Sequence, residues 1–254
     1  MLKPTSSEIQ SYAADYSMIP LCREIYADVT TPIALLRKIA QVSNRYCLLE
    51  SVEGGERWGR YSFLGYDPLV HIVCKDHVVT TEYADGRRES VTTDQPNDIL
   101  RALMAQYKAP RIEGFPPFTG GLVGYYAYRM IGYAEPTLHL RSSDVDDFDL
   151  MLFDKVIAFD NLRQKIILIA NMSLAEPEVN YSKAVLELKQ LAQLLRTGEK
   201  RPNPAGDSPA RSRRCLTRPA TAPWWSRTNT TSARAIFFRW FSPTGSALPM
   251  RAAC

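Results

Sequence analysis

Long apolar runs are missing from this sequence of 254 residues. No stretch reaches the roughly 20 apolar residues that a membrane-spanning helix needs. The opening segment Met1–Ser7 also lacks the apolar centre of a secretion signal. With 45% hydrophobic and 23% charged residues, the composition is typical of a globular protein, and we expect it in the cytoplasm.

Histidine and cysteine are too scattered to indicate a metal centre. The five cysteines are widely scattered and show no C-x-x-C spacing that would indicate a zinc site. His71, His77 and His139 stand alone, so we expect structural or surface roles for them. The acidic run at residues 144–149 lacks the glycine-centred spacing of a calcium loop and is expected to be solvated. P-loop and G-x-S-x-G motifs are absent as well.

Charge divides the chain near Lys200. Residues 201–254 contain nine arginines, no lysine and one acid, Asp207, so they carry +8, whereas residues 1–200 carry −4. The second segment shows no sustained period of 2 or 3.6 and has five prolines before residue 224. We therefore predict a folded unit over residues 1–200 and an irregular, disordered tail over 201–254. The run I-F-F-R-W-F fits ordinary disorder poorly, because disordered segments are poor in aromatics.

Strand and helix signals alternate in the first 200 residues. Apolar runs predict strands at Met18–Tyr26, Tyr46–Ser51 and Tyr61–Tyr66, and the 3.6-residue period predicts helices at Pro32–Val42 and Val179–Leu195. These signals favour an α+β fold with antiparallel sheets and flanking helices.

Two hairpins are expected within this unit. Leu69–Val91 should turn at Asp85-Gly86, a dipeptide that tolerates positive φ. Leu150–Met172 should turn at Asp160-Asn161, between strands at residues 151–159 and 165–170. Between the hairpins, Phe118–Tyr128 places three glycines among aromatics, which indicates a close approach of backbone to backbone or to a ligand.

Three segments together resemble a known enzyme family. They are L-L-E-S at Leu48–Ser51, G-R-Y-S at Gly59–Ser62 and F-T-G-G-L-V-G-Y at Phe118–Tyr125. In order and spacing they resemble the N-terminal region of the anthranilate synthase large subunit, component I, up to about residue 197. The aminodeoxychorismate synthase large subunit shares this region and is the alternative.

The resemblance implies a feedback site for L-tryptophan. In the family, the L-L-E-S segment and the strand after its loop form one wall of that site, and the C-terminal domain forms the other. The corresponding residues here are Glu50, Ser51, Arg60, Tyr61 and Ser62. Such groups suit a free amino acid, whose ammonium, carboxylate and indole need a carboxylate, polar donors and an apolar slot. The plainer reading makes Glu50 a solvated strand end and Ser51 a turn hydroxyl.

The resemblance also implies an activity that this chain would lack. Family members convert chorismate and ammonia into anthranilate and pyruvate, a lyase step in tryptophan biosynthesis. They use Mg²⁺ and receive ammonia from a glutamine amidotransferase partner, component II. The groups that hold magnesium and assist the chemistry lie in the C-terminal domain. No catalytic residue and no metal ligand can therefore be assigned here, and the chain is predicted to be inactive.

A shifted reading frame accounts for the tail. The family's catalytic domain should begin with a motif similar to G-D-I-F-Q-V-V-L-S-N-R-L. If each codon of Ala235–Ser246 is read one nucleotide earlier, all twelve positions are compatible with that motif. One position is forced, because Trp240 has the single codon TGG and Phe241 must then become valine. We expect a slip between Lys200 and Ala235.

Two other classes of function remain open from the sequence. The first is a free-standing tryptophan-binding module that uses Glu50, Ser51 and Arg60. The second is nucleic-acid binding through the arginine-rich tail, although its arginines show no helical or patch spacing.

Overall fold

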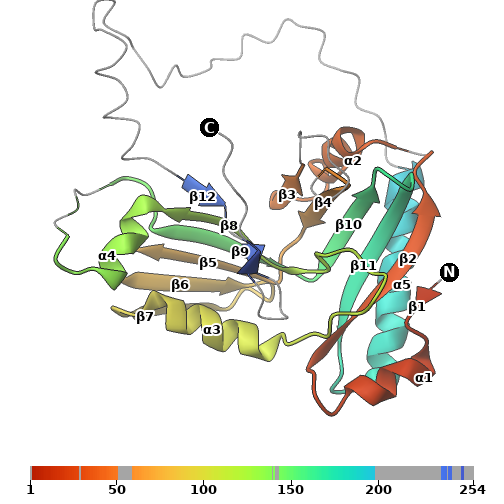
Figure 1. Ribbon diagram of the computed structural model, residues 1–254, viewed down its shortest axis with the longest axis horizontal. Coiled ribbons are helices and arrows are strands. Elements are labelled where there is room, and N and C mark those ends of the chain that lie inside the picture. The colour runs from red at the N-terminus through yellow and green to blue at the C-terminus, as the bar shows by residue number, and fades with distance from the viewer. Residues whose placement is uncertain are drawn as a thin grey trace, which may run out of the picture.

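The computed structural model describes residues 2–28, 30–50, 59–138, 140 and 143–197, together with the backbone of three short strands beyond residue 200. These residues form two antiparallel sheets that lie side by side with helices packed around them (Figure 1). The α+β class predicted from the sequence is confirmed.

The first sheet has the strand order β1-β2-β11-β10-β4-β3. The predicted strands at Met18–Tyr26 and Tyr61–Tyr66 are confirmed as β2 and β4. The other strands are β1 (Leu2–Lys3), β3 (Tyr46–Leu49), β10 (Lys155–Asp160) and β11 (Lys165–Ser173).

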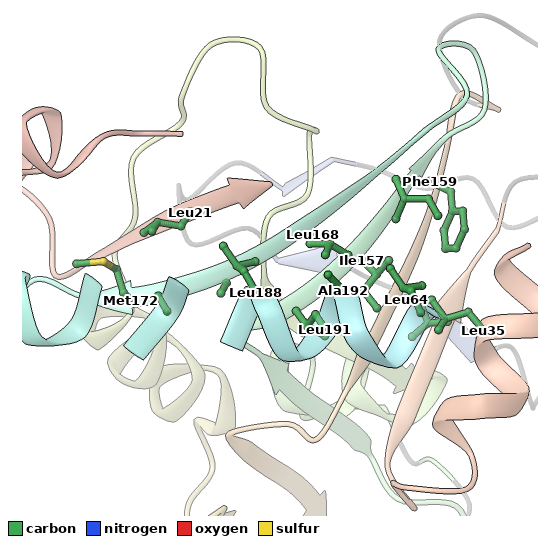
Figure 2. Packing of buried hydrophobic residues seen from close by; sticks show 14 of the residues in the cluster. Leu21, Leu35, Leu64, Ile157, Phe159, Leu168, Met172, Leu188, Leu191 and Ala192 are labelled. Atoms are coloured by element: carbon green, nitrogen blue, oxygen red, sulfur yellow. The ribbon is translucent and has the colours of Figure 1, made fainter. Parts of the chain in front are cut away.

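Two helices, α2 (Pro32–Ile39) and α5 (Pro177–Thr197), pack on this sheet. Figure 2 shows Leu188, Leu191 and Ala192 of α5 among side chains from the sheet and from α2. The predicted α2 begins where the sequence places it, because Thr31 accepts a hydrogen bond from the amide of Ala34 and proline fills the first helical position. Burial of this apolar stripe explains why periodicity alone located α5.

The second sheet has the order β14-β13-β8-β9-β5-β6-β7, with β12 also paired to β8. One of its faces packs against α3, and its apolar core joins residues of β5, β8, β9 and α3. Five helices, α1, η1, α3, η2 and α4, were not predicted. The bounds are β5 (Val70–Lys75), β6 (Val78–Tyr83), β7 (Arg88–Thr92), β8 (Gly121–Ala127), β9 (Phe148–Phe153), α1 (Ser6–Ile9), η1 (Gln10–Tyr12), α3 (Pro96–Gln106), η2 (Tyr128–Met130) and α4 (Ile131–Ala134).

The segment Leu69–Val91 is a three-stranded meander, so the prediction of a single hairpin is wrong in part. The expected turn at Asp85-Gly86 is present between β6 and β7, where Gly86 has a φ of 86°. A second turn at Asp76-His77 separates β5 from β6, and both residues have positive φ. Aspartate tolerates this conformation, but histidine gives little local signal for it.

The expected long strand at residues 151–159 divides at Asp154, which corrects the second predicted hairpin. Residues before Asp154 form β9 in the second sheet, and residues after it form β10 in the first. Only β10 and β11 then make the hairpin that turns beyond Asp160. The chain therefore passes from one sheet to the other without a helix or a long loop.

Close backbone contact explains the glycines of Phe118–Tyr128, as the sequence predicts. A Cβ on Gly124 would meet the carbonyl oxygen of Asp149 and would lie 2.8 Å from the Cα of Leu150, both in β9. At Gly120, a Cβ would lie 2.6 Å from Nδ2 of Asn171. These positions allow β8 to lie close to its neighbours.

The segment 201–254 contains three short strands, although the sequence predicts an irregular tail. They are β12 (Ile236–Phe238), β13 (Trp240–Phe241) and β14 (Ala247–Leu248). The rest of that segment, over which disorder is predicted, lies outside the described residues.

In the described part of the chain, no helix combines the length and apolar character needed to cross a membrane.

Candidate functional site

Of the predicted tryptophan-site residues, the structure describes Glu50, Arg60, Tyr61 and Ser62, which lie on or beside the outer strands β3 and β4 of the first sheet. Strand β3 is the edge strand, and Leu49 pairs with Phe63 of β4. Glu50 follows β3 directly and is exposed, and Arg60 immediately precedes β4. Ser51 and the loop that follows it, residues 51–58, lie outside the described residues. Two ends of neighbouring strands therefore present a carboxylate and a guanidinium at one sheet edge.

Arg60 is engaged by Asp160 at the end of β10. Its Nε donates to Oδ1 of Asp160 at 3.1 Å, and its Nη2 donates to Oδ2 at 2.7 Å. The Asp160 side chain is 2% exposed, whereas that of Arg60 is 24% exposed. The pair is thus bidentate and half-solvated, a geometry that fixes the plane of the guanidinium.

The turn after β10 fastens the start of β4. The amide of Asn161 donates to the carbonyl of Arg60 at 2.8 Å, and its Nδ2 lies 3.4 Å from Oγ of Ser62. The amide of Arg163 donates to Oδ1 of Asp160 at 3.0 Å. Asp160 therefore accepts hydrogen bonds from both the Arg60 side chain and the backbone of its own turn. These hydrogen bonds join the turn after β10 to the start of β4.

Electrostatics favour the ionised form of this pair. Burial opposes ionisation of Asp160, but hydrogen bonds from Arg60 and from the Arg163 amide outweigh it, so the pKa of Asp160 lies below its usual value. The hydrogen bond to Asp160 also raises the pKa of Arg60. The guanidinium is consequently a permanent, oriented cation.

Aromatic rings lie beside the cation. The Arg60 guanidinium lies 4.8 Å from the centre of the Tyr61 ring, and Tyr61 stacks on Phe63 with centroids 5.7 Å apart. Burial, followed by the charge of Asp160, raises the pKa of Tyr61. Phe63 makes an edge contact with Phe118. The arrangement offers an aromatic surface next to a fixed positive charge.

Ser62 is separated from this aromatic surface. Successive side chains of a strand point to opposite faces, so Tyr61 and Ser62 cannot face the same ligand across β4. Ser62 is 1% exposed and lies beside Asn161 rather than beside solvent. The structure thus brings Arg60 and Tyr61 together, leaves Glu50 accessible at the strand end, and places Ser62 in the interior.

Sequence reasoning missed Asp160 and Asn161 as members of this site and assigned them only to a turn. A local signal exists, because an aspartate follows four buried residues at the end of β10. Its partner Arg60 is 100 residues away in the sequence, and no local pattern could have joined them.

A second polar cluster lies in the other sheet, within the acidic run expected to be solvated. Asp147 is 1% exposed, which corrects that expectation. Its Oδ2 accepts from the Tyr133 hydroxyl at 2.8 Å and from the Asp76 amide at 2.9 Å. His71 lies 2.8 Å from Asp149 in the same run. These contacts anchor α4 and the β5–β6 turn, in agreement with a structural role.

A small pocket lined by residues of both sheets contains none of the predicted site residues. Asp154 and Asn171 line it, and each has a buried Oδ1 without a hydrogen-bond partner. Burial raises the pKa of Asp154 to about 6. Among the described residues, no group of three or more His, Cys, Asp or Glu side chains could hold a metal ion.

This two-sheet domain, with a polar site at one sheet edge, can be compared with known proteins. No protein-family model matches the chain. Anthranilate synthase component 1 of Acetivibrio thermocellus is 35% identical over 175 residues, which are 68% of this chain and 35% of the relative. The Pseudomonas aeruginosa protein of the same name is 37% identical over 196 residues, 74% of this chain and 39% of the relative.

A solved structure, anthranilate synthase component I from Streptococcus pneumoniae, covers 72% of this chain and 37% of its own, with 24% identity and a TM-score of 0.46. The sequence relatives carry the comparison: over about 70% of its length this chain is similar to proteins named anthranilate synthase component 1, a family of enzymes. It spans between a third and two fifths of the length of these relatives, 35% and 39%.

Proposed function

We propose that this chain is the N-terminal part of an anthranilate synthase component I and is inactive by itself. The observation that carries the proposal is the coverage: the similarity takes up 68% of this chain but 35% of the Acetivibrio relative. The complete protein would act in the cytoplasm, in tryptophan biosynthesis, and would convert chorismate and ammonia into anthranilate and pyruvate.

The remaining groups for catalysis would belong to the part that this chain lacks. The groups that bind magnesium and the residues that act on the ring would lie there. A glutamine amidotransferase subunit would supply the ammonia. The frame argument of residues 235–246 supports the same view, because the possible codons of these residues permit, in the adjacent frame, a motif similar to the start of the family's catalytic domain.

The site at the β3–β4 edge would be one wall of a tryptophan feedback site. Glu50 is accessible and would pair with the ligand's ammonium. Arg60, held by Asp160, would face its carboxylate, and the Tyr61 ring would contact the indole. Ser51 would contribute a hydroxyl, and Ser62 would hold the strand in place through its buried position beside Asn161.

An activity assay on two proteins tests the proposal. The first is this chain, and the second is the product of the same gene with one nucleotide inserted ahead of codon 235. Anthranilate is followed by its fluorescence after addition of chorismate, ammonium and Mg²⁺. We expect product from the second protein alone; product from this chain would contradict its inactivity, and none from the second would contradict the assigned reaction.

Inhibition by L-tryptophan then tests the site. In the frame-restored protein, Glu50→Gln should raise the inhibitory concentration at least about tenfold, because an ammonium loses a charge-assisted hydrogen bond. Glu24→Gln is the matched control, since Glu24 is an exposed carboxylate in the same sheet that pairs with Lys165. If L-tryptophan inhibited both variants and the parent equally, Glu50 would not be part of the proposed site.

A further inference from the structure

The small pocket at the junction of the two sheets has no part in the proposed function. It is lined by Asp154, which lies where β9 passes into β10, and by Asn171 of β11. Gly120 and Gly121 also line it, and both have positive φ. A Cβ on Gly120 would lie 2.6 Å from Nδ2 of Asn171 and 2.9 Å from the carbonyl oxygen of Phe153. Space and backbone conformation therefore both exclude a side chain at position 120.

The side-chain amide of Asn171 has a fixed orientation. Its Nδ2 donates to the carbonyl oxygen of Thr119 at 2.6 Å and to that of Asp154 at 2.8 Å. A flipped amide would place Oδ1 against two carbonyl oxygens, so these contacts decide which atom is the oxygen. Oδ1 is buried and has no hydrogen-bond partner among the described residues. Asn171 therefore contributes a free acceptor and no free donor.

Asp154 contributes a second acceptor, which carries a charge. Its Oδ1 is also buried without a hydrogen-bond partner, and no lysine or arginine in the described part of the chain forms an ion pair with it. Burial raises the pKa of Asp154 to about 6, the charge of Lys155 opposes this rise, and the charge of Glu187 adds to it. Tyr107 supplies the one hydroxyl of the lining, and it donates to neither Oδ1. Above its pKa, Asp154 is thus a buried anion that lacks a partner.

The chemistry of the lining limits what can bind. A water molecule could donate to both oxygens, but it would leave the buried carboxylate charge without a counter-ion, which is costly. Ca²⁺ takes about six to eight oxygens, and Mg²⁺ keeps several waters, more than a small pocket with two free side-chain oxygens provides. A small monovalent cation neutralises one carboxylate and also accepts neutral carbonyl oxygens as ligands.

We propose that the pocket of Asp154 and Asn171 binds a small monovalent cation of the size of ammonium or potassium. Asp154 supplies the charge and one oxygen, and Asn171 supplies a neutral oxygen. The bound cation joins β11 of the first sheet to the point where the chain leaves the second, so it stabilises the junction. The inference does not depend on the proposed function, because no residue of the β3–β4 edge lines the pocket.

Thermal unfolding of the 254-residue chain at about pH 8 tests the site. Circular dichroism gives the Tm in ammonium, potassium and choline chloride at equal ionic strength; choline has no N–H group and is too large for the pocket. The Tm should rise by about 3–5 °C for each tenfold increase of ammonium or potassium above the Kd. Asp154→Asn keeps the shape without the charge and should abolish this rise. Asp85→Asn, which changes an exposed carboxylate, is the matched control and should respond like the parent.

The salts also distinguish the ligands. A rise in ammonium alone supports a cation held by N–H donors, and a rise in both salts supports selection by size. The same Tm in all three salts would overturn the proposal, and so would a rise of equal size in Asp154→Asn, which would place the binding elsewhere.

A second measurement needs only the parent chain, in case Asp154→Asn does not fold. Carbon-13 NMR of labelled aspartate carboxyls follows the titration of Asp154 directly. The cation favours the ionised form, so the pKa of Asp154 should be lower in ammonium or potassium chloride than in choline chloride. The same pKa in all three salts would contradict the proposal.

Discussion

The pair Arg60–Asp160 allows a prediction of stability whose size follows from burial. Asp160→Asn preserves shape but removes the charge that holds the guanidinium, and it weakens hydrogen bonds from Arg60 and from the Arg163 amide. Breaking a fully buried pair costs about 3–5 kcal/mol. Arg60 is 24% exposed and regains some hydration, so we expect a loss of about 2–3 kcal/mol at pH 7.

A matched control has the same chemistry at the surface. Asp85 also accepts from an arginine side chain, Arg87, and from its amide, but the two side chains are 54% and 64% exposed. Exposed pairs contribute little, so Asp85→Asn should cost less than about 1 kcal/mol. Urea unfolding of both variants, followed by circular dichroism, measures the difference.

The pH dependence separates the ion pair from a general packing effect. The pKa of Asp160 is lowered in the folded protein, so its contribution is complete above the unfolded value of roughly 3.9 and disappears as the pH falls through the folded pKa. The difference in free energy of unfolding between the parent chain and Asp160→Asn should therefore become smaller below about pH 4. A cost equal to that of Asp85→Asn, or a gap unchanged at pH 3, would refute the reasoning.

Two further predictions concern the junction of the sheets. Gly124→Ala should lower the free energy of unfolding, measured in urea, by about 3 kcal/mol, since its Cβ would meet the backbone of β9. Gly86→Ala is the control: its Cβ would meet open space but its φ is positive, so we expect a loss of about 1 kcal/mol. Similar losses for the two variants would contradict the argument. Asp154→Asn should stabilise the protein at pH 8 by roughly 1–3 kcal/mol. The pKa of Asp154 is raised to about 6, so the parent loses stability as the pH rises through that value; a benefit that persists at pH 4 would show another cause.

Hydrophobic periodicity predicted the strands and helices that are buried on one face and end at turn or capping residues. Strand β4 lies at Tyr61–Tyr66 as expected, and helix α5 contains the predicted Val179–Leu195. The division at Asp154 escaped prediction because the run on both sides of it is apolar, and strand length alone did not distinguish one strand from two.

The site shows the same limit at a longer range. Glu50, Arg60 and Tyr61 were assigned to the candidate site from the family resemblance of two segments that lie close together in the sequence. The residue that orients Arg60 comes from a turn 100 positions later, and the burial of Ser62 depends on that turn as well. In the tail, the aromatic run I-F-F-R-W-F contradicted ordinary disorder, but only the sheet shows which strand accepts it.

The passage of the chain from β9 to β10 at Asp154 has a mechanical consequence. β4 pairs with β10, the same length of backbone continues as β9, and β9 pairs with β8. A displacement of β4 beside the candidate site would be carried along residues 148–160 into the second sheet, because no loop separates β9 from β10. Residues 148–160 therefore couple the proposed amino-acid site mechanically to the second sheet, and stiffening or loosening them would change how strongly that sheet responds to a ligand at the β3–β4 edge.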